Sequence, residues 1–240
     1  MRKRSVVPSL ITVCNLFCGF LSIFYTVQGK LLPAAWLIVI AAFLDAFDGK
    51  IARFIDAPSQ FGVNFDSLAD VCSFGVAPAL LMFHYYDNLL SVRWLPFGVC
   101  FLFLLCGALR LARFNTQLKG FEKENFSGLP IPSAAVTLAS YIVFTQRVWE
   151  SAHEPHIAIS LCAMISFLMV STFEYQAFPK FQFSTTKDRL KLVCYLVAVL
   201  LMVIYTDEVF FPLAFVYAIS GAIRWLFNLI TDREVADIPN

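Results

Sequence analysis

The chain has 240 residues, of which 59% are hydrophobic and only 15% are charged, and its net charge is +1. Soluble domains contain roughly 45–50% apolar and about 25% charged residues. The composition therefore excludes an ordinary soluble domain, and the small net charge gives no reason to expect a nucleic-acid partner. We expect one all-α domain over residues 1–240, built as a polytopic integral membrane helical bundle.

Eight stretches are long and apolar enough to cross a bilayer, for which a helix needs about 20 residues. In chain order they cover residues 9–28, 32–53, 62–86, 94–115, 130–148, 157–173, 191–206 and 208–228. Only Thr206, Asp207 and Glu208 interrupt the apolar run at the last boundary. The division of 191–228 into two spans therefore rests on these three residues.

The basic residues predict the orientation of the spans. With the N-terminus inside and eight alternating spans, the outer side receives Lys30, Arg93 and Arg147, and the inner side receives the other 15 of the 18 lysines and arginines. Cytoplasmic loops of membrane proteins carry an excess of these residues. Both termini are therefore predicted to be cytoplasmic.

Four aspartates lie near the predicted cytoplasmic ends of the second and third spans. Asp45 and Asp48 are three residues apart and Asp66 and Asp70 are four apart, so each pair shares one face of its helix. Counted from the helix ends, Asp45 and Asp70 are both about 12 Å deep, and Asp48 and Asp66 lie nearer the surface. We expect the four carboxylates to converge between two antiparallel helices.

Unpaired, four such carboxylates would cost on the order of 10 kcal/mol in a bilayer. Two hard cations, Mg²⁺ or Mn²⁺, would offset this cost, and the pattern lacks the histidines and cysteines that zinc prefers. Proton sharing, solvation at the helix ends, or pairing with Lys50 and Arg53 are the alternatives. Small residues flank the aspartates at Gly49, Ala52 and Gly62. They would let a ligand approach the backbone, or they would serve helix packing.

Other polar residues lie at the same predicted end of the bundle. Arg110 and Arg113 share a helix face, where they would hold a carboxylate or phosphate or act as cytoplasmic anchors. Thr12 and Asn15 share a face of the first span, within reach of the crevice or of a neighbouring helix. The segment 128–132, GLPIP, breaks the backbone before the fifth span and would shape a substrate site or form a plain turn.

The aspartate region resembles the signature of the CDP-alcohol phosphotransferases. From Asp45 to Asp70 the chain reads Asp-x2-Asp-Gly-x2-Ala-Arg-x8-Gly-x3-Asp-x3-Asp, which matches that signature without any change of spacing. Residues 8–23, 110–115 and 126–135 are further similar to the membrane-embedded phosphatidylserine synthases of this family. The likeness covers about residues 5–140, and the last three spans add little that is specific.

The resemblance implies a homodimeric enzyme of the bacterial cytoplasmic membrane, surrounded by membrane lipids and with its active site facing the cytoplasm. It would transfer a phosphatidyl group from CDP-diacylglycerol to L-serine and release CMP. Asp45, Asp48 and Asp66 would be metal ligands, and Asp70 the general base, a ligand of the second metal, or both. The nucleotide-binding residues that it implies are Gly49, Ala52, Arg53 and Gly62.

Two other functions remain open on the residues alone. The first is the same chemistry with another acceptor, namely glycerol 3-phosphate, inositol, inositol phosphate or choline, and the paired Arg110 and Arg113 would suit a phosphorylated one. The second is a divalent-cation transporter, since intramembrane carboxylates also mark ion pathways. Transporters often have repeated halves and sites near the midplane. Here no repeat is visible and the aspartates lie toward one face.

Overall fold

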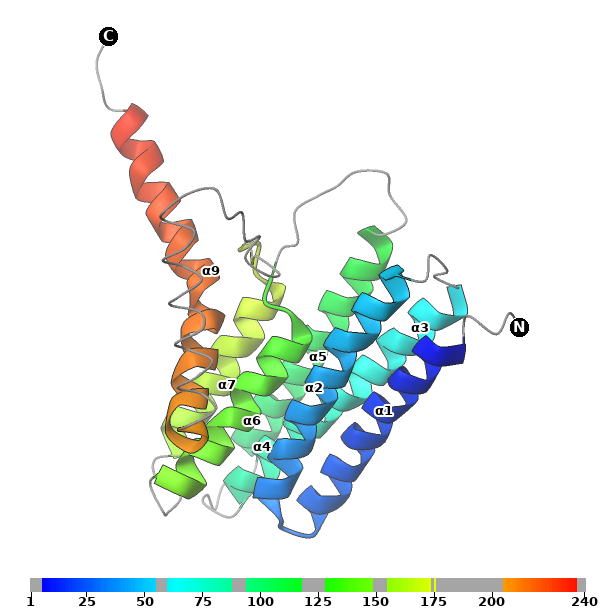
Figure 1. The fold of residues 1–240 in the computed structure, drawn as a ribbon. Coiled ribbons are helices and arrows are strands. Elements are labelled where there is room, and N and C mark those ends of the chain that lie inside the picture. Colours follow the sequence, from blue (N-terminus) through cyan, green and yellow to red (C-terminus); the bar gives the residue numbers. More distant parts are fainter. Residues whose placement is uncertain are drawn as a thin grey trace.

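The computed structural model describes residues 6–54, 60–87, 94–117, 128–148, 155–173, 175 and 205–236. These residues form helices and short connections without a strand, so the predicted all-α class is confirmed for the described part of the chain. The helices run up and down as one bundle (Figure 1). In order they are α1 (Val6–Val27), α2 (Leu31–Phe54), α3 (Gln60–Asp70), η2 (Val71–Val76), α4 (Ala77–Asp87), α5 (Trp94–Gln117), α6 (Ile131–Val148), α7 (Pro155–Val170) and α9 (Thr206–Ala236).

Several of these helices are suited to a membrane, but the count of eight spans stays a prediction. Among the described residues, five segments have the length and apolarity of a span: Leu10–Val27, Leu31–Asp48, Phe61–Tyr86, Trp94–Thr116 and Thr206–Thr231. The apolar helix α7 is shorter, with 16 residues. The predicted span 191–206 lies outside the described residues, and the location of the termini is a prediction as well.

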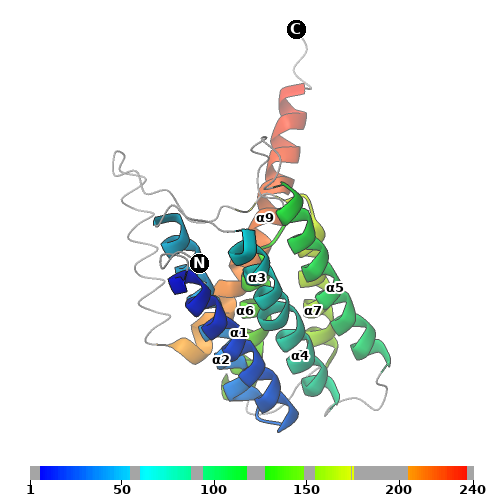
Figure 2. The ribbon, with the colours of Figure 1, turned by 90° about the vertical axis from the view of Figure 1, so that its right-hand side faces the viewer.

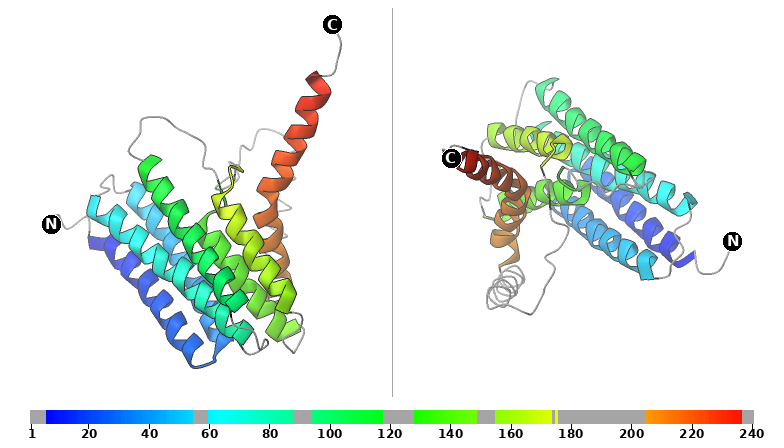
Figure 3. Two further views of the ribbon diagram at one scale, coloured as in Figure 1. Left: turned by 180° about the vertical axis from the view of Figure 1, so that it is seen from behind. Right: turned by 90° about the horizontal axis from the view of Figure 1, so that it is seen from above.

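The residues that marked the last predicted boundary begin a helix. Asp207 and Glu208 lie in the first turn of α9, where carboxylates interact favourably with the positive end of the helix dipole. α9 packs against α6 and α7, and its C-terminal part projects beyond the bundle (Figures 1 and 3).

Helix α1 has its polar face inside and its apolar face outside. Its buried positions recur every three or four residues and carry small or polar side chains: Thr12, Asn15, Gly19, Ser22 and Thr26. The exposed positions carry large apolar side chains: Leu10, Val13, Phe17, Phe20, Phe24 and Val27. A helix in water would show the reverse pattern. The arrangement fits a helix that meets lipid on one side and a polar interior on the other.

The continuous helix over residues 60–87 contains a π-helical segment, η2, where the sequence predicted one regular helix over 62–86. The amide of Ala77 donates to the carbonyl of Cys72, five residues earlier. A π-helical turn holds an extra residue, which rotates the side chains before it relative to those after it. The side chains of Asp66 and Asp70 are therefore rotated about the helix axis relative to those of α4. Ser73, Phe74 and Gly75, within η2, are buried against neighbouring helices.

The start of α6 is tied to the end of α7. Gly128 has a φ of +88°, and its amide donates to the carbonyl of Phe173 at 2.9 Å. The amide of Leu129 donates to the carbonyl of Leu168 at 3.0 Å. The predicted break at GLPIP is therefore an ordered turn over its first residues, and α6 begins inside the segment, at Ile131. From there α6 runs through the interior between α2, α7 and α9 (Figure 2).

Candidate active site

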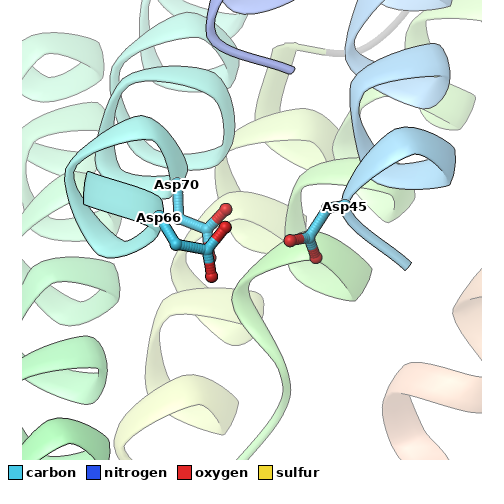
Figure 4. A group of neighbouring side chains, drawn as sticks. All are labelled: Asp45, Asp66 and Asp70. Carbon is cyan, nitrogen blue, oxygen red and sulfur yellow. The ribbon is translucent and has the colours of Figure 1, made fainter. Parts of the chain in front are cut away.

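Three carboxylates from two helices meet inside one end of the bundle. Asp45 on α2 faces Asp66 and Asp70 on α3 (Figure 4), and one oxygen of each lies within 4.8 Å of the others. Asp70 is buried, and Asp45 and Asp66 are half-buried. The close approach of three acidic groups in an apolar bundle is unfavourable unless a cation or protons neutralise it.

Asp48 lies beside this group and is turned toward α1. Its Oδ2 accepts a hydrogen bond from Thr12 Oγ1, and its side chain is buried. Its other oxygen, Oδ1, is buried without a hydrogen-bond partner among the described residues. Asp48 also interacts electrostatically with Asp45 and Asp66. A buried carboxylate oxygen without a donor is costly, so this atom indicates a place for a cation.

Helix α1 also supports Asp70. Asn15 Nδ2 donates to Asp70 Oδ1 at 3.3 Å, and Ser73 Oγ donates to the backbone carbonyl of Asn15 at 3.1 Å. The guanidinium of Arg110 on α5 interacts electrostatically with Asp70. Asp70 is thus oriented by the Asn15 amide and lies in the field of a cation.

The donor set fits a hard divalent cation. The close group consists of carboxylates alone, and among the described residues no histidine or cysteine joins it. Mg²⁺ and Mn²⁺ prefer such oxygen ligands, and the unpartnered Asp48 Oδ1 offers one more. Asp45, Asp66 and Asp70, with Asp48 beside them, are therefore the residues able to hold metal.

The remaining predicted site residues divide into three groups. Gly49, Ala52 and Arg53 continue α2 beyond Asp48, but their side chains lie outside the described residues. Gly62 lies in the first turn of α3 and is half-buried. The two arginines differ in environment, since Arg110 is half-buried and interacts electrostatically with Asp70 while Arg113 is exposed. The binding of a carboxylate or phosphate by both arginines stays a prediction.

The structure also brings polar residues to the site that the sequence did not single out. Ser133, in the first turn of α6, and Tyr217, on α9, share a hydrogen bond. Asn115 Nδ2 donates to Ser67 Oγ at 2.9 Å and links α5 to α3 one residue from Asp66. Ser133 lies in the stretch 126–135, whose similarity to the phosphatidylserine synthases could have identified it as a site residue from the sequence. Tyr217 stands in an apolar helix with no pattern around it.

Comparisons with known proteins agree with this geometry. A family model described as CDP-alcohol phosphatidyltransferase matches residues 5–173. A protein named CDP-diacylglycerol–serine O-phosphatidyltransferase from Helicobacter pylori is 35% identical over 224 residues, which cover 93% of this chain and 92% of the relative. One of the same name from Methanocaldococcus jannaschii is 30% identical over 226 residues, covering 94% and 97%. An archaetidylserine synthase from Methanothermobacter thermautotrophicus is 42% identical over 171 residues, covering 70% and 68%.

Proposed function

Because the chain belongs to the CDP-alcohol phosphatidyltransferase family, we propose that it transfers a phosphatidyl group from CDP-diacylglycerol to L-serine and releases CMP. Its carboxylate cluster carries the proposal, since Asp45, Asp66 and Asp70 come from the signature and meet in space. The relatives named for a serine acceptor match this chain over nearly its full length, which supports serine. Their names give no support to glycerol 3-phosphate, inositol or choline as the acceptor.

The substrate explains why the aspartates need cations. A CDP-lipid carries a negatively charged pyrophosphate, which four carboxylates would repel. Asp45, Asp48 and Asp66 would hold two Mg²⁺ or Mn²⁺ ions, and Asp70 would serve as the base, as a ligand of the second ion, or as both. When bound, such ions neutralise phosphate charge and stabilise the departing phosphate.

Asp70 is the residue best placed to accept the proton of the acceptor. The serine hydroxyl oxygen forms a bond to the lipid-bearing phosphorus, the pyrophosphate bond to that phosphorus breaks, and CMP leaves with the bonding electron pair. The hydroxyl proton passes to a carboxylate oxygen of Asp70. Asn15 positions that carboxylate by a hydrogen bond and Arg110 interacts with it electrostatically, and such positioning is worth much of a catalytic rate.

The side of the membrane follows from the charge distribution. The ends of α2 and α5 and the start of α3 lie at the aspartate end of the bundle (Figure 1). The sequence places 15 of its 18 lysines and arginines on that side. By the positive-inside tendency, the site opens toward the cytoplasm of a bacterial inner membrane. At the opposite end of the bundle, Nε of Arg147 lies 3.9 Å from Oδ2 of Asp207.

The test is an assay of the purified full chain with CDP-diacylglycerol and Mg²⁺ or Mn²⁺, in lipid–detergent micelles. CMP release is measured with serine, glycerol 3-phosphate, inositol, inositol phosphate or choline, and the lipid product is identified by mass spectrometry. We expect serine-dependent CMP release and a phosphatidylserine product. Release with glycerol 3-phosphate but not serine would contradict serine as the acceptor and leave the family chemistry intact.

Matched variants test the role of the carboxylates. Asp66→Ala and Asp70→Asn should each lower CMP release by at least a hundredfold, a loss typical of groups that act directly in the reaction. Asp207→Asn is the control, because Asp207 lies in the first turn of α9, which begins at the opposite end of the bundle from the start of α3 (Figure 1). Equal losses in all three variants would mean that the effect is general destabilisation.

A further inference from the structure

A second group of polar side chains lies next to Asp70, between α5, α6 and α9. Its centre is Arg110, whose Nε is buried without a hydrogen-bond partner among the described residues. The guanidinium interacts electrostatically with both Asp70 and Tyr217. A buried guanidinium nitrogen without an acceptor indicates that an anionic ligand completes the site.

The neighbours of Arg110 are suited to the same anion. Tyr217 and Ser133 share a hydrogen bond, so their two hydroxyl groups lie together, and Tyr217 interacts electrostatically with Arg110. Ser133 is in the first turn of α6, an 18-residue helix whose positive dipole end lies there. The group therefore supplies hydrogen-bond donors from one guanidinium and two hydroxyls, and positive charge from the guanidinium and a helix N-terminus. This combination recognises a carboxylate or a phosphate.

This group is held in place by the segment that follows α7. Tyr175 Oη donates to the carbonyl of Ala218 at 2.7 Å, and its ring lies 6.1 Å from that of Tyr217, centroid to centroid. The carbonyl of Phe173 accepts the amide hydrogen bond of Gly128, just before α6. Phe173 and Tyr175 thus brace the start of α6 and the middle of α9, which preorganises the hydroxyls.

The acceptor substrate, serine, carries the anionic group that would complete the site around Arg110. Serine carries a carboxylate, and only its α- and β-carbons separate that carboxylate from the reacting hydroxyl. Because Arg110 lies within electrostatic range of Asp70, a small amino acid bound at Arg110 through its carboxylate would bring its hydroxyl near the aspartates. The carboxylates of the cluster would then also attract the ammonium group of serine.

Resting on the proposed transfer to serine, we propose that Arg110, Ser133 and Tyr217 form the pocket that binds the acceptor carboxylate, and that Tyr217 is a specificity-determining residue of the enzyme. α9 lies outside residues 5–173, the part matched by the family model. Recognition of the amino-acid acceptor therefore depends on a helix that the family signature does not include.

The experiment compares wild type, Tyr217→Phe and Tyr205→Phe, each as the full chain in lipid–detergent micelles. Tyr205 is the control, because it precedes α9 and is exposed. The Michaelis constants for serine and for CDP-diacylglycerol are measured, together with the inhibition constant of the product CMP. A hydrogen bond to a charged group is worth enough to raise KM for serine by about tenfold or more in Tyr217→Phe. The other two constants should stay within about twofold, as should all three in Tyr205→Phe.

The outcomes separate the pocket from the function on which it rests. If wild type uses serine and Tyr217→Phe keeps the wild-type KM for serine, the pocket is wrong and the proposed function stands. If KM for CDP-diacylglycerol or the inhibition by CMP changes instead, the group binds a donor phosphate, which also overturns the proposal. If wild type releases no CMP with serine, the function and the pocket both fail. These constants do not depend on the amount of folded protein, so a lower yield of a variant does not affect them.

Discussion

Gly19 should be among the most sensitive positions of α1, because α1 and η2 touch there. A Cβ added at Gly19 would lie 2.4 Å from Ser73 Oγ and 2.7 Å from Ser73 Cα. Rotation of the serine hydroxyl would break its hydrogen bond to the carbonyl of Asn15, and it would leave the contact with the backbone Cα unchanged. In Gly19→Ala the two helices must therefore move apart.

The size of the effect follows from a comparison with Gly98→Ala, since nothing lies within 4 Å of a Cβ added at Gly98. Both changes replace a helical glycine by alanine, so the gain in helix propensity of up to about 1 kcal/mol cancels between them. Overpacking costs about 1–3 kcal/mol. At about 2–4 °C per kcal/mol for a chain of this size, Gly19→Ala should melt about 2–12 °C below Gly98→Ala.

The same displacement should lower activity, because α1 carries both side chains that support the aspartates. The hydrogen bond from Asn15 to Asp70 is already 3.3 Å long, and a shift of about 1 Å at a catalytic group can cost a hundredfold in rate. Melting is measured by fluorescence in detergent, and CMP release by the serine assay. If Gly19→Ala has the same melting temperature and the same rate of CMP release as Gly98→Ala, then α1 and η2 do not touch at Gly19 and Ser73, and the prediction is refuted.

Three further predictions concern other contacts. Asp45→Asn should raise the Mg²⁺ concentration for half-maximal CMP release by at least tenfold, because one carboxylate of the close group is lost. An unchanged Mg²⁺ concentration for half-maximal release would exclude Asp45 as a ligand. Gly128→Ala should lower the melting temperature more than Gly19→Ala does, since a φ of +88° is strained for alanine and its Cβ would lie 2.3 Å from the carbonyl oxygen of Met169; a wild-type melt would contradict this turn. Asn115→Ala should cost only about 0.6 kcal/mol, the average for an interhelical hydrogen bond in a membrane, and a shift of the melting temperature beyond about 5 °C would show a larger role for that contact.

The site was predictable in large part because its residues are close in sequence. Asp45 and Asp70 lie on helices that follow each other, so helix periodicity and depth were sufficient to expect them together. The same reasoning placed Asp48 equally with the others. In the structure Asp48 accepts a hydrogen bond from the Thr12 hydroxyl, and the closest group consists of Asp45, Asp66 and Asp70. The separate position of Asp48 depends on how closely α1 packs against α2, which the spacing of residues along the chain does not predict.

Composition and pattern by themselves determined the helical class, the membrane character and the carboxylate pair on each of two helices, because these depend on local periodicity and on the cost of charge in lipid. The homodimer, the cytoplasmic termini and the number of spans stay predictions. Tertiary structure alone decided which arginine is half-buried within electrostatic range of Asp70, and that η2 departs from the α-helix. It also decided that Tyr217 meets Ser133. The physical reason is that the apolar surfaces of α6, α7 and α9 fit lipid or one another almost equally well. Their mutual positions are set by shape and by a few buried hydrogen bonds, which hydropathy does not record.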